Sequence, residues 1–273
     1  MKLKELPGAL WHSLRLRLAP LRRPAGIPVP VTVTLTSIPS RLHALDIVVK
    51  SLLAQATAPE RIVVWLREDL RGSVPDRVRR LEGDRVRIRF VPLGSSHKKL
   101  VFAVAENPDR VHVTCDDDMI YPTEWLGRLW AEHLRHPGDI IANDVRAVRY
   151  DDAGDPLPYE RWRLDPDETR ETAPEFMSVG WAGVLYPPRC FHPDVTREEL
   201  FLDLTPRADD LWFKAMSHLA GTRVRRAPDP GRSPIPIPFT QGVALKRANV
   251  AEDRNRTQWM ALMEAYDLRF DGA

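Results

Sequence analysis

The sequence predicts an α/β protein built on a mainly parallel, doubly wound sheet flanked by helices. Two observations predict this class. Short apolar runs alternate with helix-like stretches from residue 29 to residue 148, which is the spacing of β-α-β units. One of these runs, RVHVTC at 110–115, stops on three consecutive aspartates, Asp116, Asp117 and Asp118. Ligands of open α/β sheets bind beyond the carboxyl ends of the strands, so this edge is also the expected site.

Composition narrows the class of protein. The chain has 273 residues, of which 43% are hydrophobic and 29% charged, and this suits one globular unit or two closely packed halves. A net charge of +2 gives no support for nucleic-acid binding. Two distant cysteines, Cys115 and Cys190, make neither a disulfide framework nor a zinc site. No stretch resembles a membrane span or a signal peptide, so we expect a cytoplasmic protein.

Residues 1–25 form a basic extension with two open interpretations. Leu10, Trp11, Leu14 and Leu18 share one face of a potential helix. The positive charges around them are Lys2, Lys4, Arg15, Arg17, Arg22 and Arg23. The segment is either an interfacial helix that attaches the protein peripherally to the inner face of a membrane, or a disordered or simply packed extension.

Residues 26–150 carry the β-α-β pattern. The expected strands are 29–36, 61–66, 86–91, 111–115 and 139–148, and the expected helices are 42–54, 74–81, 100–106 and one capped by Thr123 that ends near residue 136. Because parallel strands end at a common edge, that edge should also hold the polar residues that follow the first two strands. These are Thr36, Ser37, Arg41, Glu68 and Asp69.

Charged side chains at this edge predict two kinds of ligand. Three adjacent carboxylates repel one another unless a hard divalent cation neutralises them, although a solvated acidic turn is the alternative. Lys98 and Lys99 begin the helix at 100–106, where positive charge opposes the helix dipole. A diphosphate opposite them would remove the conflict, and plain surface lysines are the alternative. His97 is expected to be a polar loop residue.

Residues 151–273 have a looser, irregular pattern. The acidic, proline-bearing segment 151–172 predicts a long surface excursion, and the proline-rich 227–238 predicts an exposed loop. Two glycines, Gly180 and Gly183, precede a strand within 178–188, where the backbone either approaches a ligand or forms a bulge. Asp209 and Asp210 occupy the first turn of the next helix, and a final helix is expected at 255–267.

Five motifs in order carry a resemblance to a known family. They are TLTSIPSR (34–41), SHKKL (96–100), TCDDDMIYPTEWL (114–126), GWAGVLYPP (180–188) and ADDLWFKAM (208–216). Over residues 29–219 the chain resembles bacterial GT-A-type, family 2-like glycosyltransferases of surface-polysaccharide biosynthesis. It departs from the family pattern at Ala182, where a glycine is usual, and at His97, where a tyrosine is usual. The resemblance implies a GT-A-like domain with a nucleotide-sugar-binding half at 26–150 and an acceptor-binding half at 151–273.

The resemblance also implies a reaction and a set of site residues. The reaction is metal-dependent, inverting transfer of a sugar from a nucleoside diphosphate sugar, expected to be a UDP-sugar, to a hydroxyl of a cell-surface glycan. Asp116 and Asp118 would hold Mn2+ or Mg2+, and the base would be one of Asp209 and Asp210, with Asp210 favoured. Donor-binding residues would be Thr36, Ser37, Arg41, Lys98, Lys99, Asp116, Asp117 and Gly183. A nucleotidyltransferase and a non-catalytic glycan- or nucleotide-binding relative are the alternatives.

Overall fold

The computed structural model describes residues 5–20, 26–240 and 253–270, and its centre is a seven-stranded sheet in the order β10-β6-β9-β4-β1-β2-β3. The strands are β1 (Ile27–Thr36), β2 (Thr57–Arg67), β3 (Val86–Val91), β4 (Val111–Thr114), β6 (Ile140–Ala142), β9 (Val184–Tyr186) and β10 (Val224–Arg226). All neighbours pair in parallel except β9, which is antiparallel to β4 and β6. The predicted α/β class with a mainly parallel sheet is therefore confirmed.

Burial on both faces explains why the strands were readable from the sequence. Along β2, Ile62 and Val64 belong to one apolar core. Val63 and Trp65, which alternate with them, belong to a second core on the opposite face. Strands covered on both sides are almost continuously apolar, and successive side chains alternate between the faces. The helices that follow the strands are α2 (Leu45–Leu53), α3 (Asp76–Arg79), α4 (Val101–Glu106) and α5 (Trp125–Arg135), each within a few residues of its prediction.

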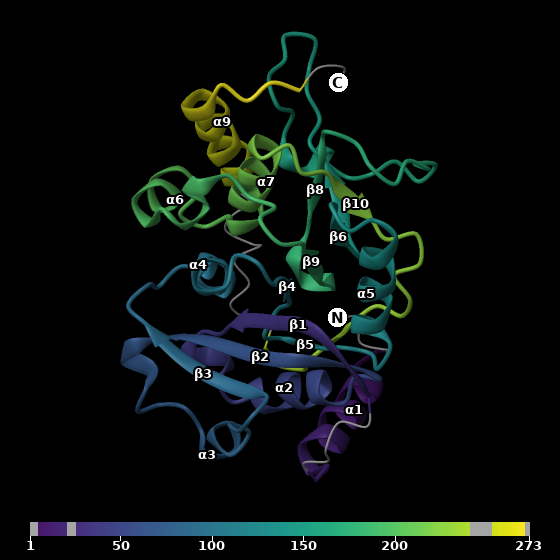
Figure 1. Ribbon diagram of the computed structural model, residues 1–273, viewed down its shortest axis with the longest axis vertical. Coiled ribbons are helices and arrows are strands. Elements are labelled where there is room, and N and C mark those ends of the chain that lie inside the picture. The colour runs from purple at the N-terminus through teal and green to yellow at the C-terminus, as the bar shows by residue number, and fades with distance from the viewer. Residues whose placement is uncertain (1–4, 21–25, 241–252, 271–273) are drawn as a thin grey trace.

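The second half builds its core from aromatic side chains. Its main helices are α6 (Glu198–Leu204), α7 (Asp209–Leu219) and α9 (Arg254–Tyr266), of which α6 was not predicted. Trp162, Trp212 and Trp259 are completely buried among them. Trp162 anchors the otherwise exposed excursion at 151–172 by an edge-to-face contact with Trp259, with ring centroids 6.2 Å apart. Figure 1 shows β1, β2, β3 and α2 in the lower part of the molecule and α6, α7 and α9 in the upper part.

Two local predictions were wrong, and a third was incomplete. The expected strand at 139–148 is two strands, because the chain leaves the main sheet at Asn143 and pairs β7 (Val145–Ala147) with β8 (Phe176–Ser178). Thr123 does not cap α5, since its hydroxyl donates to the Glu124 carboxylate. The loop at 227–238 includes the short strand β11 (Ile235–Pro236), which pairs with β5 (Met119–Ile120). A two-residue edge strand tolerates proline, because few of its amides face a partner.

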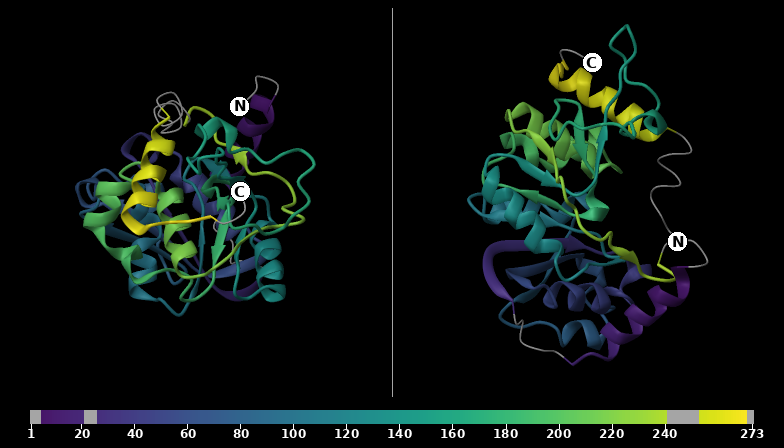
Figure 2. Two further views of the ribbon diagram at one scale, coloured as in Figure 1. Left: turned by 90° about the horizontal axis from the view of Figure 1, so that it is seen from above. Right: turned by 90° about the vertical axis from the view of Figure 1, so that its right-hand side faces the viewer.

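The N-terminal segment contains the helix α1 (Leu6–Leu18), which packs on α2. Arg17 pairs with Asp46 at 3.4 Å, and Lys50 Nζ donates to the carbonyls of Arg17 and Ala19. Figure 2 shows α1 in purple beside the layer that holds β1. None of the helices in the described parts of the chain is long and apolar enough to cross a membrane. Lys2, Lys4, Arg22 and Arg23 lie outside the described residues.

Candidate active site

A cavity of about 700 Å³ opens where β1 and β4 end, between the two halves of the chain. Its inner walls come from five places: the turn after β1, the Ser96–Lys99 turn, the aspartates after β4, the glycine segment before β9, and the start of α7. Most of the predicted site residues meet here, and they are Thr36, Ser37, Arg41, Lys99, Asp116, Asp117, Asp118, Asp209 and Asp210. The sheet therefore brings together residues that are far apart in the chain, such as Ser37 and Asp117, as its topology requires.

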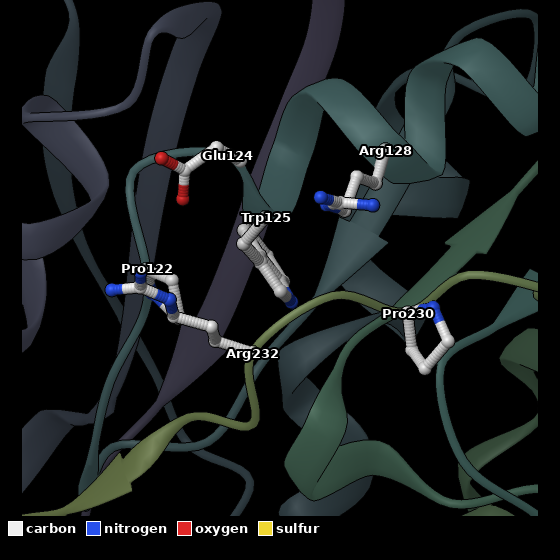
Figure 3. A pocket seen from close by; sticks show the side chains of 6 residues that line it. All are labelled: Pro122, Glu124, Trp125, Arg128, Pro230 and Arg232. Atoms are coloured by element: carbon white, nitrogen blue, oxygen red, sulfur yellow. The ribbon is translucent and has the colours of Figure 1, made fainter.

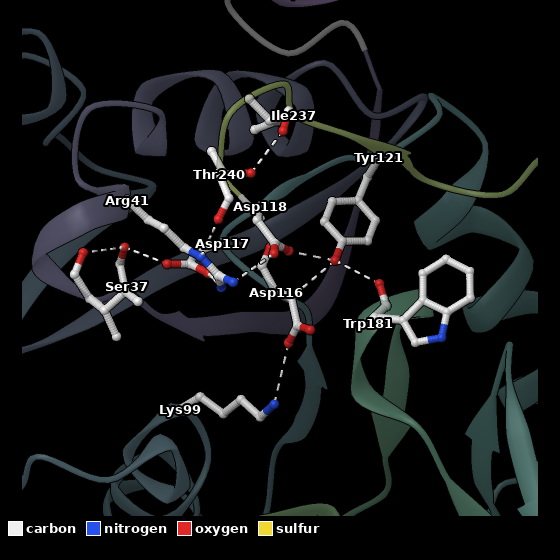
Figure 4. Close-up of polar contacts among 11 residues, drawn as sticks. Ser37, Arg41, Lys99, Asp116, Asp117, Asp118, Tyr121, Trp181, Ile237 and Thr240 are labelled. Atoms are coloured by element: carbon white, nitrogen blue, oxygen red, sulfur yellow. Dashed lines mark hydrogen bonds and ion pairs between the residues drawn. The ribbon is translucent and has the colours of Figure 1, made fainter. Parts of the chain in front are cut away.

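Asp117 and Asp118 are held by the turn that follows β1. Ser37 Oγ donates to Asp117 Oδ2 at 2.5 Å, and Arg41 Nη1 donates to Asp117 Oδ1 at 2.7 Å (Figure 4). Arg41 Nη2 lies 3.0 Å from Asp118 Oδ2. Burial raises the pKa of Asp117, and the Arg41 cation and the Ser37 hydroxyl oppose this rise. One guanidinium thus fixes two adjacent carboxylates with its planar fork.

Asp116 is the most open carboxylate of the triplet. Its side chain is 34% exposed, and Lys99 Nζ approaches its Oδ1 at 3.4 Å. Its backbone amide donates to the Tyr121 hydroxyl at 2.8 Å, and that hydroxyl donates to the Trp181 carbonyl at 3.0 Å. Figure 4 shows Tyr121 between Asp116 and Trp181. The buried tyrosine therefore ties the acidic edge to the glycine segment opposite.

The triplet fits a divalent cation that takes few protein ligands. Its donors are hard carboxylate oxygens, and both Asp116 and Asp118 line the cavity. The oxygens of the three aspartates do not converge as a metal-binding group: Ser37 and Arg41 engage both oxygens of Asp117, and Arg41 also pairs with Oδ2 of Asp118. Magnesium-like ions usually take one or two carboxylates and complete their shell with water and substrate phosphates. Asp116 and Asp118 are therefore the residues that could hold a cation here.

Lys99 links Asp116, at the end of β4, to Asp209 at the start of α7. Its side chain is 8% exposed, and Nζ lies 2.9 Å from Asp209 Oδ2. Burial lowers the pKa of Lys99, but Asp209, Asp116 and Asp210 together raise it well above its ordinary value, so the amine is charged. Ser96 Oγ donates to the other oxygen of Asp209 at 2.8 Å. Despite burial, the neighbouring Lys99 cation lowers the pKa of Asp209. Asp209 Oδ1 thus accepts a hydrogen bond, whereas its Oδ2 accepts none among the described residues and is engaged by the Lys99 ion pair.

Asp210 differs from its neighbour in having an available oxygen. Its Oδ2 accepts from the Gly180 amide at 3.3 Å, while its buried Oδ1 has no hydrogen-bond partner among the described residues. Burial raises the pKa of Asp210, and the negative charge of Asp209 raises it further. A buried carboxylate that lines a cavity, has an unused oxygen and holds its proton unusually tightly is suited to general-base chemistry.

Gly180 lies where the charged ends of Lys99, Asp210 and Asp116 come close together. A Cβ at this position would lie 3.0 Å from Lys99 Nζ and 3.2 Å from Asp210 Oδ1, with Asp116 Oδ1 also within 4 Å. A side chain here would displace charged atoms on both sides of the cavity. Close approach rather than backbone conformation therefore favours glycine at this position.

Four predicted edge residues do not line the cavity. Gly183 has φ of +104°, and a Cβ there would lie 2.4 Å from the Trp125 indole, so this glycine serves packing against α5. Lys98 Nζ turns away and donates to the Gly94 and Ser95 carbonyls, and burial lowers its pKa to about 8. Glu68 and Asp69 are exposed and pair with arginines of their own segment.

His97 was expected to be a polar loop residue and is instead completely buried. Its Nδ1 lies 2.6 Å from Ser95 Oγ, its Nε2 lies 3.2 Å from Thr205 Oγ1, and its ring stacks on Phe201. Burial lowers the pKa of His97 to about 4, so the ring is neutral at physiological pH. It fastens the Lys99 turn to the segment that leads into α7. The family that the chain resembles usually has an aromatic tyrosine at this position, and that is the signal from which the burial of His97 could have been predicted.

The outer wall of the cavity was missed by the sequence analysis. It is formed by Asp144, Arg146, Tyr159, Arg163, Met177, Val179, Trp181, Arg207 and Asn255. The excursion at 151–172 contributes two of these residues, as its predicted surface role suggested. The others follow irregular segments whose positions no local pattern specifies.

A small pocket and a cluster of three potential metal ligands lie outside this cavity. A pocket of about 170 Å³ beside α5 is lined by Pro122, Glu124, Trp125, Arg128, Pro230 and Arg232 (Figure 3). Glu132, His136 and Glu171 come close enough to hold a metal ion. However, Arg135 pairs with Glu132, and Arg225 pairs with Glu171, so cationic side chains already balance these acids.

Comparison with known proteins supports the fold. No protein-family model matches the sequence, and no curated protein shows significant similarity to it. Among solved structures, the mannosyltransferase PcManGT from Pyrobaculum calidifontis in complex with GDP-Man and Mn2+ is similar with a TM-score of 0.53 and 16% identity, over 97% of this chain and 74% of that one. At this identity the likeness shows a GT-A-like fold and leaves activity to be argued from the site.

Two other similar structures have lower scores. S. aureus TarS 1–349 has a TM-score of 0.48 and 14% identity, over 87% of this chain and 72% of that one. The CMP:2-keto-3-deoxy-manno-octonic acid synthetase complexed with CTP has a TM-score of 0.42 and 15% identity, over 74% of this chain and 89% of that one.

Proposed function

We propose that the protein is a metal-dependent, inverting glycosyltransferase that uses a nucleoside diphosphate sugar, with UDP as the expected nucleotide, and a hydroxyl of a cell-surface glycan. The observation that carries the proposal is that one cavity contains both candidate cation ligands and a candidate general base. Asp116 and Asp118 offer cation ligands at the carboxyl edge of the sheet, and Asp210 presents an unused carboxylate oxygen across from them. Both Asp116 Oδ1 and Asp210 Oδ1 lie within 4 Å of the place a Gly180 Cβ would occupy.

On this proposal the turn after β1 and the aspartates bind the donor. Thr36, Ser37 and Arg41 shape the nucleotide end, and Asp117 keeps Arg41 in place. A bound cation would supply charge stabilisation of the leaving diphosphate, an effect of several kcal/mol. Lys99, which is charged and buried, adds a fixed positive charge between the diphosphate end and α7.

Asp210 acts on the acceptor. Its Oδ1 takes the proton of the acceptor hydroxyl as that oxygen bonds to the anomeric carbon and the bond from this carbon to the diphosphate oxygen breaks. The electron pair leaves with the nucleoside diphosphate, and the configuration inverts because attack comes from the opposite face. Asp209 stays ionised beside Lys99 and keeps α7 in register. Asp210 then returns its proton to solvent.

Ligand binding and activity test the proposal together. We expect UDP and Mn2+ to raise the melting temperature jointly, because both bind only the folded protein. We expect the full chain to hydrolyse or transfer from one member of a nucleotide-sugar panel in a cation-dependent reaction. Exchange of pyrophosphate with a nucleoside triphosphate would identify a nucleotidyltransferase instead. Joint binding without turnover on any donor would indicate a non-catalytic relative.

We also propose that α1 places the enzyme at a membrane surface. Leu10, Trp11, Leu14 and Leu18 remain 44–74% exposed although the helix is docked on α2. Arg15 lies among them, and such a face suits an anionic interface. We expect Trp11→Ser/Leu14→Ser to reduce binding to phosphatidylglycerol vesicles severalfold, while Leu134→Ser, at a similarly exposed leucine on α5, leaves it unchanged. Equal vesicle binding by all three proteins would remove this role.

A further inference from the structure

The outer wall of the cavity has an excess of positive charge. Three arginines, Arg146, Arg163 and Arg207, line it, and Asp144 is the one carboxylate among the described residues of the same wall. The rest of the cavity lining carries five aspartates, Asp116, Asp117, Asp118, Asp209 and Asp210, against two cations, Arg41 and Lys99. The cavity is therefore polarised, with one end suited to a cation and the other suited to an anion.

Two of the outer arginines are not neutralised by the described parts of the chain. Arg163 is exposed and forms no hydrogen bond or ion pair with a described residue. Arg146 lies over the Tyr159 ring, 4.4 Å from its centroid, and donates to the Tyr159 carbonyl at 3.4 Å, without a described carboxylate partner. Stacking on Tyr159 holds the guanidinium in place while its charge remains available.

Neighbouring side chains make this wall suitable for a sugar. The indole of Trp181 donates to Asp144 Oδ2 at 2.7 Å, which fixes the ring at the edge of the cavity. Asn255 is buried, lines the cavity and has an Oδ1 without a hydrogen-bond partner among the described residues. An aromatic face, a buried amide oxygen and arginine forks are groups that bind a sugar with its hydroxyls and an acidic substituent.

We propose that the acceptor is an acidic glycan, and that Arg146, Arg163 and Arg207 bind a carboxylate or phosphate group on it. This inference rests on the glycosyltransferase function proposed above and names its acceptor class. The donor does not account for these arginines, because its diphosphate belongs at the Asp116–Asp118 end, where a cation and Lys99 provide the charge. A guanidinium can bind either a carboxylate or a phosphate through two parallel N–H groups.

Binding of small probes to the full chain tests this class directly. In the presence of UDP and diamagnetic Mg2+, saturation-transfer NMR would compare methyl β-D-glucuronide, glucose 6-phosphate and methyl β-D-glucoside. We expect at least one acidic probe to bind about tenfold tighter than the neutral one, the minimum for a charge-assisted hydrogen bond. The preferred probe then identifies the anion as carboxylate or phosphate.

Two substitutions test whether the outer arginines cause the preference for an acidic probe. Arg163→Gln should abolish most of the preference without changing the melting temperature, since Arg163 is exposed and forms no hydrogen bond or ion pair with a described residue. Arg161→Gln is the matched control: it is an exposed arginine of the same segment, it does not line the cavity, and its loss should leave the preference intact.

The inference is overturned if the neutral probe binds as well as the acidic ones, including no detectable binding of any, or if Arg161→Gln acts as strongly as Arg163→Gln. It is also overturned if Arg163→Gln weakens UDP binding instead, because the arginines would then serve the donor. Loss of all joint UDP and Mn2+ binding in the unaltered protein would refute the proposed function, whereas probe binding without UDP still measures the anion preference.

Discussion

Replacement of Lys99 by methionine should destabilise the protein more than any neighbouring charge change. Lys99 Nζ lies 2.9 Å from Asp209 and 3.4 Å from Asp116, and its side chain is only 8% exposed. Removal of one member of a buried ion pair leaves the other charge unbalanced, which costs about 3 to 5 kcal/mol. At about 2 to 4 °C for each kcal/mol in a chain of this size, the melting temperature should fall by about 6 to 20 °C.

The partner of the lost charge supplies the control. If Asp209 is the carboxylate left unbalanced, Lys99→Met/Asp209→Asn should recover about 2 kcal/mol or more relative to the sum of the single changes, measured by urea unfolding. Lys98→Met is the matched lysine, since Lys98 donates only to two carbonyls and its pKa is already lowered by burial. Its effect should be smaller and independent of Asp209.

The pH dependence gives a second check on the same pair. In the unaltered protein the folded-state pKa of Asp209 is lowered to about 2, so its stabilisation is present above the unfolded pKa and is lost as pH falls through the folded value. Without Lys99 the buried carboxylate should bind its proton more tightly, so the deficit of Lys99→Met should shrink on acidification. Additive single effects, or a loss below about 1 kcal/mol, would refute the buried ion-pair network.

Three other predictions follow from the site geometry. Asp118→Ala should abolish the joint stabilisation by UDP and Mn2+ and leave the melting temperature of the ligand-free protein within a few degrees, whereas retention of full metal-dependent binding would exclude Asp118 from the cation site. Gly180→Ala should lower kcat at least about tenfold with little effect on stability, because its Cβ would press on Lys99 and Asp210; normal kcat would show that this approach is not needed. The rate should fall about tenfold for each pH unit below about 7, since the raised pKa of Asp210 keeps the base protonated there, and a flat acid limb would exclude Asp210 as that base.

The sequence predicted the first half well because its signals are local. In β2 the run Ile62–Leu66 is buried on both faces and is therefore continuously apolar, and Asp116–Asp118 follow the buried strand β4 abruptly. The break at Asn143 was missed because apolar residues continue on both sides of it, so the change of sheet leaves no periodic signal.

The direction in which a side chain points was harder to predict than which residues lie at the site. Lys98 and Lys99 are adjacent, yet the short 3-10 turn directs one toward backbone carbonyls and the other toward Asp209. His97 looks like a loop residue because its burial depends on Phe201 and Thr205, about a hundred positions later. The outer arginines likewise acquire their common direction only from tertiary contacts, such as Arg146 with Tyr159.

The most direct test of the central claim is the turnover of Asp210→Asn on a confirmed donor and acceptor, with the anomeric configuration of the wild-type product determined by NMR. The proposed mechanism predicts inversion in the wild-type product, a loss of about a hundredfold or more in kcat for Asp210→Asn, and a donor affinity close to wild type. Asp209→Asn serves as the matched carboxylate, with a smaller loss because both of its oxygens are already engaged by Lys99 and Ser96. Near-normal turnover by Asp210→Asn, or a product with retained configuration, would contradict the assignment of Asp210 as the base in this cavity.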